Sequence, residues 1–172
     1  MAIIEKLDQE SGEADLPQLV GVFQDAINNG ASLGFLPPLT AANAEKFWRK
    51  ILAEVGEGSR VLLVARENGR IAGTVQAELA MKENGQHRAE VQKLMVHTSF
   101  RRRGIARALL KALEEEAQKI SRTLLVLDTE LGSEAEKLYP TCGYERVGVI
   151  PQFAVRTDRT FVSTVVFYKT LD

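Results

Sequence analysis

The chain has 172 residues, of which 45% are hydrophobic and 26% are charged, and this composition is typical of one globular domain over residues 1–172. The net charge of −1 argues against nucleic acid as a partner, because proteins that bind it carry a broad basic surface. A single cysteine excludes an internal disulfide. One cysteine and two histidines are also too few for a typical metal site, so we expect no metal. We also expect a cytoplasmic protein with no membrane partner, because the sequence has neither a signal peptide nor a long apolar span.

The predicted elements follow from the spacing of apolar residues and from the turn residues between them. Leu19, Phe23 and Ile27 recur at helical spacing, and Asn68-Gly69 between two apolar runs predicts a β-hairpin. In chain order we predict a strand at 2–7, helices at 17–27 and 40–55, strands at 59–67, 70–80 and 87–97, a helix at 105–120, a strand at 124–129, a helix that begins at Ser133 and is closed by Gly143, and strands at 144–155 and 161–171. Hairpins imply antiparallel strands, and the crossover helix between residues 90 and 128 implies parallel ones. The predicted fold class is therefore α/β, with a mixed, twisted sheet of about seven strands and helices on both faces.

A run of basic residues lies between the predicted strand at 87–97 and the predicted helix at 105–120. The run comprises Arg101, Arg102, Arg103, Gly104, Ile105, Ala106 and Arg107. A turn with a glycine at a helix N-terminus exposes unpaired backbone N–H groups, and these groups favour an anion together with the helix dipole. Guanidinium groups add forked donors that suit phosphate oxygens. The run therefore predicts a phosphate-bearing ligand, and the alternative is a basic helix start on a solvated surface.

Two motifs, in this order, resemble those of one enzyme family. The spacing R-x-x-G-x-A at 101–106 resembles the R/Q-x-x-G-x-G/A signature of the GNAT acetyltransferase superfamily, and 135–144 resembles its A-x-x-L/F-Y-x-x-x-G-F/Y helix. The predicted order of strands and helices is also that of the GNAT fold. The stretches 30–35, 88–96, 127–130 and 165–171 are similar to the tabtoxin-resistance branch of the superfamily.

The resemblance implies acetyl-CoA as co-substrate and assigns residues to it. In the family, the loop that matches 101–107 holds the pyrophosphate, and the strand backbone at Leu94, Met95 and Val96 meets the acetyl carbonyl and the pantetheine. Gly132 stands where many members have asparagine, so a pantetheine contact is expected either to be lost or to pass to Ser133.

The catalytic candidates also come from the resemblance. Tyr139 matches the residue that protonates the departing thiolate, and Glu90 and Asp128 match carboxylates that help to activate the acceptor. The alternatives are a packing role for Tyr139, a solvated strand position for Glu90, and a loop or cap position for Asp128. Pro140 directly follows Tyr139 and is expected to kink or stop the helix there.

The loop at 30–38 supplies candidates for the acceptor side. Ser32 allows close approach of a ligand and Phe35 offers an apolar surface, although packing of Phe35 into the core is an equal alternative. We therefore interpret the chain as an N-acetyltransferase whose acceptor is a small-molecule amine, or a hydroxyl, on an antibiotic, a toxin or a metabolite. The rival functions are a protein N-terminal or lysine acetyltransferase and a non-catalytic acyl-CoA binding module. The sequence leaves open the acceptor, the base, and the choice between a monomer and a homodimer.

Overall fold

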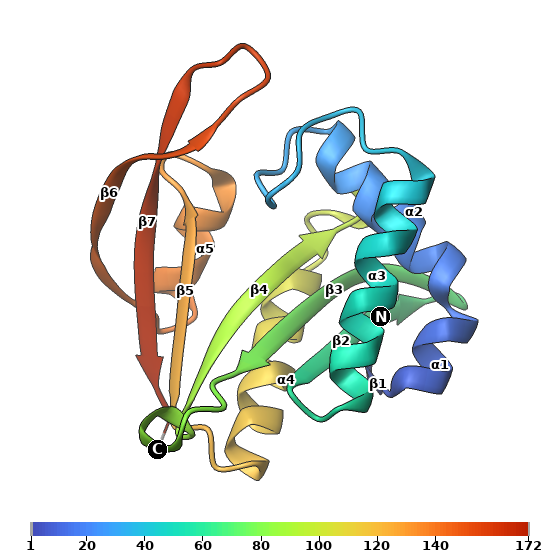
Figure 1. Ribbon diagram of the computed structural model, residues 1–172, viewed down its shortest axis with the longest axis horizontal. Helices are drawn as coiled ribbons and strands as arrows, with labels where there is room; N and C mark the ends of the chain where they lie inside the picture. The colour runs from blue at the N-terminus through green and yellow to red at the C-terminus, as the bar shows by residue number, and fades with distance from the viewer. Residues whose placement is uncertain (1, 172) are drawn as a thin grey trace.

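Seven strands form one mixed, twisted sheet in the order β1-β2-β3-β4-β5-β7-β6 (Figure 1). The computed structural model describes residues 2–171. The strands are β1 (Ile3–Leu7), β2 (Arg60–Glu67), β3 (Arg70–Leu79), β4 (Arg88–Val96), β5 (Leu124–Glu130), β6 (Glu145–Val155) and β7 (Phe161–Thr170). The helices are α1 (Gln9–Ala14), α2 (Leu16–Asn28), α3 (Ala41–Gly56), α4 (Ile105–Lys119) and α5 (Glu134–Thr141), with 3-10 turns at Glu83–Gly85 and Thr98–Phe100. Among these described residues, no helix is long and apolar enough to cross a membrane.

Two apolar cores hold the helices against opposite faces of the sheet. α2 and α3 cover one face, where Phe23, Trp48 and Leu62 are fully buried. α4 covers the other face with Leu109 and Leu113, which are equally buried. Figure 1 shows α2 and α3 in front of the sheet and α4 and α5 behind it. The predicted mixed sheet with helices on both faces is therefore confirmed.

Helix α1 departs from the sequence prediction. Its residues form no apolar stripe, and Gly12 is the one buried residue of the helix, so hydrophobic spacing gives no helical signal. A capping box starts the helix instead: Asp8 Oδ1 accepts from the Ser11 amide at 2.8 Å, and the Asp8 amide donates to Ser11 Oγ at 3.0 Å. A Cβ atom on Gly12 would lie 2.1 Å from Leu52 Cδ2, so glycine lets α1 pack closely on α3.

A β-bulge interrupts β4. Gln76 of β3 pairs with Gln92, whereas Thr74 pairs with Met95, so one residue of β3 faces two residues of β4. Lys93 lies in this bulge with a left-handed φ of 51°, and its carbonyl accepts a hydrogen bond from the buried Thr74 Oγ1 at 3.1 Å. The sequence predicts a continuous strand here, because its residue types do not signal the extra residue.

After Glu90, and thus before the bulge, β4 separates from β5. Within residues 2–171 the parallel pairing joins only residues 88–90 of β4 to residues 124–126 of β5. Figure 1 shows the two strands diverging from this short ladder. The backbone of residues 94–96 therefore lies along β3 on one edge and is left without β5 on the other. We call this second edge the free edge of β4.

Helix α5 does not stop at Tyr139. It continues through Pro140 to Thr141, so of the two expected effects of the proline, a kink or a stop at Tyr139, the stop is wrong. Pro140 lies in the last turn, so its missing amide removes one hydrogen bond near the helix end and not in a long helical interior. The chain then leaves the helix at Gly143, whose φ of 82° is readily adopted by glycine.

Candidate active site

The turn between β4 and α4, together with the first three residues of α4, contains the basic run, residues 101–107, which we call the arginine turn. Gly104 is the N-cap of α4 with a left-handed φ of 77°, which glycine adopts without steric cost. The Ala108 amide donates to the Gly104 carbonyl at 3.0 Å, so the amides of residues 105–107 precede the helical hydrogen bonds and have no acceptor within the helix. Together with the helix dipole, these amides form an end that attracts an anion.

The arginines of this turn differ in their contacts. Arg101, Arg103 and Arg107 each donate to an oxygen atom of the protein, at distances of 3.1–3.4 Å. The guanidinium of Arg102 is exposed and has no hydrogen bond or ion pair within residues 2–171. Arg102 is therefore the arginine of this turn whose donors are all free for a ligand, a distinction that the sequence does not make.

The free edge of β4 leads directly into the arginine turn. The 3-10 turn between them is fixed to α2, because the Thr98 amide donates to Asp25 Oδ2 at 2.7 Å and Thr98 Oγ1 donates to Asp25 Oδ1 at 2.8 Å. The unpaired backbone groups on the free edge of β4 are thus followed in the chain by the N-terminus of α4, which attracts anions. An extended ligand with polar amide groups and a terminal phosphate matches this order of groups.

Glu90 lies on β4 before the bulge, with an exposed side chain. Gln92 Nε2 donates to Glu90 Oε1 at 3.0 Å, and Arg60 Nη1 donates to Gln92 Oε1 at 3.0 Å. Because a guanidinium only donates, the amide oxygen of Gln92 must face Arg60, and its NH₂ group is turned toward Glu90. Arg60 is 7% exposed and is also bound to Glu54 and Glu78. This network fixes one oxygen of Glu90 and leaves the other without a partner among the described residues.

Asp128 lies on the same face of the sheet as Glu90. Glu90 is paired with Val126, and Asp128 follows Val126 by two residues, so the side chains of both acids project to one side. Thr164 on β7 is 3% exposed, and its Oγ1 donates to Asp128 Oδ2 at 2.6 Å. The same hydroxyl lies 2.8 Å from the Thr129 carbonyl, so its one proton has two possible acceptors. The structure thus holds both carboxylates of the sequence prediction on one surface.

Tyr139 combines a packed ring with an unpartnered hydroxyl. The residue is 5% exposed, and its ring contacts those of Tyr144 and Phe167 at centroid distances of 5.6 and 5.7 Å. Its hydroxyl has no hydrogen-bond partner within residues 2–171 and, unlike that of Tyr144, is not fully buried. Burial raises the pKa of the Tyr139 phenol, and the charge of Asp128 raises it further. The phenol therefore keeps its proton at neutral pH and lies within electrostatic reach of Asp128.

The loop between α2 and α3 is fixed to the bulge of β4. Lys93 Nζ donates to the Leu33 carbonyl at 2.8 Å. The Phe35 ring lies edge-on to the rings of Phe23 and Phe47, at 5.2 and 5.6 Å, and is partly buried. Ser32 is exposed. Phe35 thus packs mostly into the core, and neighbouring residues of the loop, among them Ser32, form its exposed surface.

Ser133 is the N-cap of α5. Its Oγ accepts from the Glu136 amide at 3.2 Å and lies 3.3 Å from Thr129 Oγ1. Glu136 does not close the capping box, because its carboxylate accepts from the Gly132 amide at 2.6 Å. One lone pair of Ser133 Oγ is therefore occupied by the helix, and its proton is directed at Thr129 or at a ligand.

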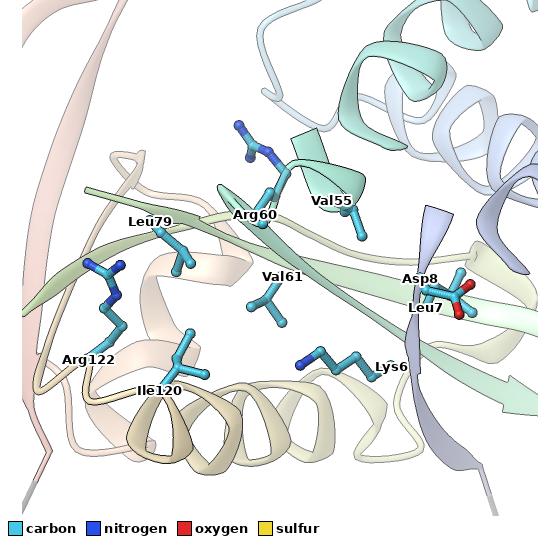
Figure 2. A pocket seen from close by; sticks show the side chains of 10 residues that line it. Lys6, Leu7, Asp8, Val55, Arg60, Val61, Leu79, Ile120 and Arg122 are labelled. Carbon is cyan, nitrogen blue, oxygen red and sulfur yellow. The ribbon is translucent and has the colours of Figure 1, made fainter. Parts of the chain in front are cut away.

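A hollow of about 590 Å³ lies next to the C-terminal end of α4 (Figure 2). Ile120 and Arg122 line it just after the C-terminus of α4, whereas the arginine turn lies at the N-terminus of this 15-residue helix. Its three cations are already bound: Lys6 pairs with Glu116 at 3.0 Å, Arg60 pairs with two carboxylates, and Arg122 donates to the Ala80 carbonyl at 2.8 Å. The hollow shares Arg60 with the network that holds Glu90, but it lies away from the arginine turn. Nowhere in residues 2–171 do three or more potential metal ligands cluster.

Sequence reasoning missed four side chains of this region: Arg60, Gln92, Lys93 and Thr164. Strand pairing brings them to the site from far along the chain, since Arg60 and Gln92 are 32 positions apart and Thr164 follows Asp128 by 36. The signals available were a charged residue at the start of a buried strand and two polar residues within the stretch 88–96. Neither feature predicts which distant residue each side chain contacts.

Comparison with known proteins agrees with this geometry. The family model of the acetyltransferase (GNAT) domain matches residues 58–146, which include the arginine turn and all three catalytic candidates. An uncharacterised N-acetyltransferase of Azospirillum brasilense is 34% identical over 119 residues, or 66% of this chain and 67% of the relative. The L-methionine sulfoximine/L-methionine sulfone acetyltransferase of Pseudomonas paraeruginosa is 24% identical over 152 residues, or 88% of this chain and 87% of the relative.

A solved structure shows the same fold. A Salmonella typhimurium protein with its cofactor acetyl-CoA superposes with a TM-score of 0.80 at 19% sequence identity. The match covers 100% of this chain and 95% of that one, so it extends over the whole sheet and all helices described above.

Proposed function

The chain belongs to the GNAT acetyltransferase family, and from this premise we propose that it transfers the acetyl group of acetyl-CoA to the amine of a small molecule. The observation that carries the proposal is a convergence at the splayed ends of β4 and β5. The anion-binding arginine turn, the free edge of β4, two carboxylates and a protonated phenol all adjoin this point. The free edge can take the amide groups of pantetheine, and Arg102 with the amides of residues 105–107 can take the phosphates.

Acetyl-CoA supplies the acetyl group as a thioester, and the residues of this chain manage the protons. An amine must lose its extra proton before it attacks, and Asp128 is the base that we assign to this step. Its charge acts on Tyr139 and also on Lys93, which supports a central position among the reacting groups. Glu90, held by Gln92, attracts the ammonium form of the acceptor.

Tyr139 acts at the other end of the transfer. As the new carbon–nitrogen bond forms and the carbon–sulfur bond breaks, the phenol donates its proton to the sulfur. The nitrogen loses its second proton as the amide forms, and this proton restores the phenol of Tyr139 through solvent. Asp128 passes the first proton, taken from the ammonium, to water. The raised pKa of Tyr139 suits this role because the phenol stays protonated until an anion forms beside it. The same apolar surroundings would also destabilise a thiolate and raise its pKa, which lowers the cost of this proton transfer.

The small size of the acceptor is supported by a relative. The Pseudomonas paraeruginosa enzyme is named for two amino-acid-like molecules, L-methionine sulfoximine and L-methionine sulfone. In this chain, the loop over the site is tied to β4 through Lys93 and Leu33 and packed through Phe35, which favours a confined acceptor over a long peptide.

The test is release of the coenzyme A thiol with acetyl-CoA and a panel of small amines, L-amino acids and short peptides. We expect turnover of small amines, and we expect Asp128→Asn to lower kcat by roughly 10²- to 10⁴-fold, as for loss of a general base. The acetyl-CoA dissociation constant should stay close to that of the wild type. Glu115→Gln on the exposed face of α4 is the matched control and should behave as wild type.

Three results would contradict the proposal. Undiminished turnover by the Asp128→Asn variant would remove its assignment as base. Turnover of peptides alone would indicate a protein acetyltransferase. Tight binding of acetyl-CoA without turnover of any acceptor would indicate a binding module.

A further inference from the structure

Lys93 is placed at the acceptor side by unusual backbone geometry. It lies in the bulge of β4 with a φ of 51°, a conformation that L-residues other than asparagine and aspartate rarely adopt. This conformation turns its side chain to the loop between α2 and α3, where Nζ donates to the Leu33 carbonyl and lies 5.6 Å from the centre of the Phe47 ring. A Cβ atom on Gly34 would lie 3.8 Å from this nitrogen, an ordinary van der Waals contact, so the backbone of the loop passes close to the ammonium.

The ammonium of Lys93 is incompletely satisfied. It carries three donors, and the Leu33 carbonyl is its one hydrogen-bond acceptor within residues 2–171. No carboxylate among these residues lies within ion-pair distance of it, although the side chain is half-buried. Burial lowers the pKa of this ammonium, and Arg60 lowers it further, whereas the charges of Asp128 and Glu90 raise it. A partly buried cation without a contacting counter-ion is costly, and a bound anion would relieve that cost.

We propose that Lys93 binds an anionic group of the acceptor, and that the acceptor is an amine with a carboxylate close to it, as in an amino acid. This inference rests on the proposed function and adds the class of substrate. The negative and positive side chains of the site suit such a molecule. Asp128 and Glu90 attract its ammonium, and the two unused N–H groups of Lys93 donate to its carboxylate. An acceptor that has an amine but no carboxylate would leave the ammonium of Lys93 without a counter-ion.

A purely structural role for Lys93 is the competing explanation. In that case its bond to Leu33 fastens the loop, and its charge has no ligand. The two roles predict different kinetics, because a fastening role affects every acceptor, whereas a recognition role affects only acceptors that bear an acid.

The experiment compares acceptors in matched pairs. Each L-amino acid of a panel that includes L-methionine sulfone is paired with the amine that remains after decarboxylation, and kcat/KM is measured for both. The wild type should prefer the amino acid. In Lys93→Met, the preference ratio should fall by roughly 10- to 100-fold, the effect of losing a hydrogen bond to a charged group, and the loss should lie in KM. Lys93→Arg keeps the charge and should retain most of the ratio.

Each other outcome overturns the inference. Equal use of both members of a pair by the wild type would show that the carboxylate is not recognised, and turnover of amines would still leave the proposed function standing. A uniform loss in Lys93→Met, with the ratio kept, would assign the residue a fastening role. A thermal melt shows whether Lys93→Met is folded. If it is not, the preference ratio of Lys93→Arg decides: a ratio close to that of the wild type supports the inference, and a lost ratio overturns it. No turnover of either member, with acetyl-CoA bound, would overturn the proposed function itself.

Discussion

Gly73 marks a close approach between β3 and β4, on the paired edge of β4 that lies opposite its free edge. It pairs with Val96, and a Cβ atom added to it would lie 2.6 Å from the Met95 carbonyl oxygen and 3.3 Å from Val96 Cα. Both neighbours are backbone atoms, so neither can rotate away. To restore an ordinary contact, the two strands would have to separate by roughly 0.8 Å, which a close-packed interior resists.

We therefore expect Gly73→Ala to reduce both stability and activity. Overpacking of this kind costs about 1–3 kcal/mol of unfolding free energy. For a chain of this length, that corresponds to a drop in Tm of roughly 2–10 °C. The displaced backbone is the one that we propose to meet the thioester, and a misplacement of about 1 Å in an active site can lower the rate by around 100-fold.

Urea unfolding and thiol release test this prediction together. Gly21→Ala is the matched control, because Gly21 is exposed in α2 and a Cβ atom there would have nothing within 4 Å. The same chemical change should stabilise that variant by about 0.5–1 kcal/mol. A Gly73→Ala protein with wild-type stability and wild-type turnover would refute the argument that the close approach of β3 and β4 sets the geometry of the site.

Three further predictions concern charge. Arg102→Gln should weaken acetyl-CoA binding by about 10-fold in calorimetry, because a charged hydrogen bond is lost, and an unchanged affinity would place the phosphates elsewhere. The pKa values of Tyr139, Tyr144 and Tyr168 are all raised, the first two by burial and the third by a hydrogen bond to a carboxylate. At pH 10 the folded protein should thus show less tyrosinate absorbance than the urea-unfolded protein. The free energy of unfolding should fall above pH 10, because phenols of the unfolded chain lose protons that those of the folded chain keep. Coincident titration curves of the folded and unfolded protein would contradict this. Arg60→Met should lower the free energy of unfolding by about 1–3 kcal/mol, since its carboxylate partners are 23% and 50% exposed and water replaces part of the contact. A loss below about 0.5 kcal/mol would show that the network is not stabilising.

Much of the fold can be predicted from local patterns. The hairpin at Asn68-Gly69 is present, with φ values of 52° and 75° that match a two-residue turn. The helix after the arginine turn and the apolar strand β5 also lie where their spacing predicts them. These features succeed because each is determined by residues that are near one another in the chain.

The remainder depends on partners far apart in sequence or on backbone detail. The bulge at Lys93 arises from a mismatch between β3 and β4 that neither strand reveals alone. The orientation of Gln92 is fixed by Arg60, 32 positions away. Helix α1 forms through the Asp8 cap and close packing at Gly12 without an apolar stripe. Pro140 is tolerated because it falls in the last turn of α5, a boundary that sequence patterns place only to within a few residues.

The most direct test of the account is an amide NMR titration of the wild-type protein with acetyl-CoA and, separately, with acetyl-pantetheine, which lacks the phosphates. Acetyl-CoA should shift the amides of residues 94–96 and of 104–107, whereas acetyl-pantetheine should shift only the first group. That difference would place the thioester arm on the free edge of β4 and the phosphates on the arginine turn. Shifts centred on Ile120 and Arg122 at the distant hollow, or an arginine turn that responds to neither ligand, would contradict the assignment of this site.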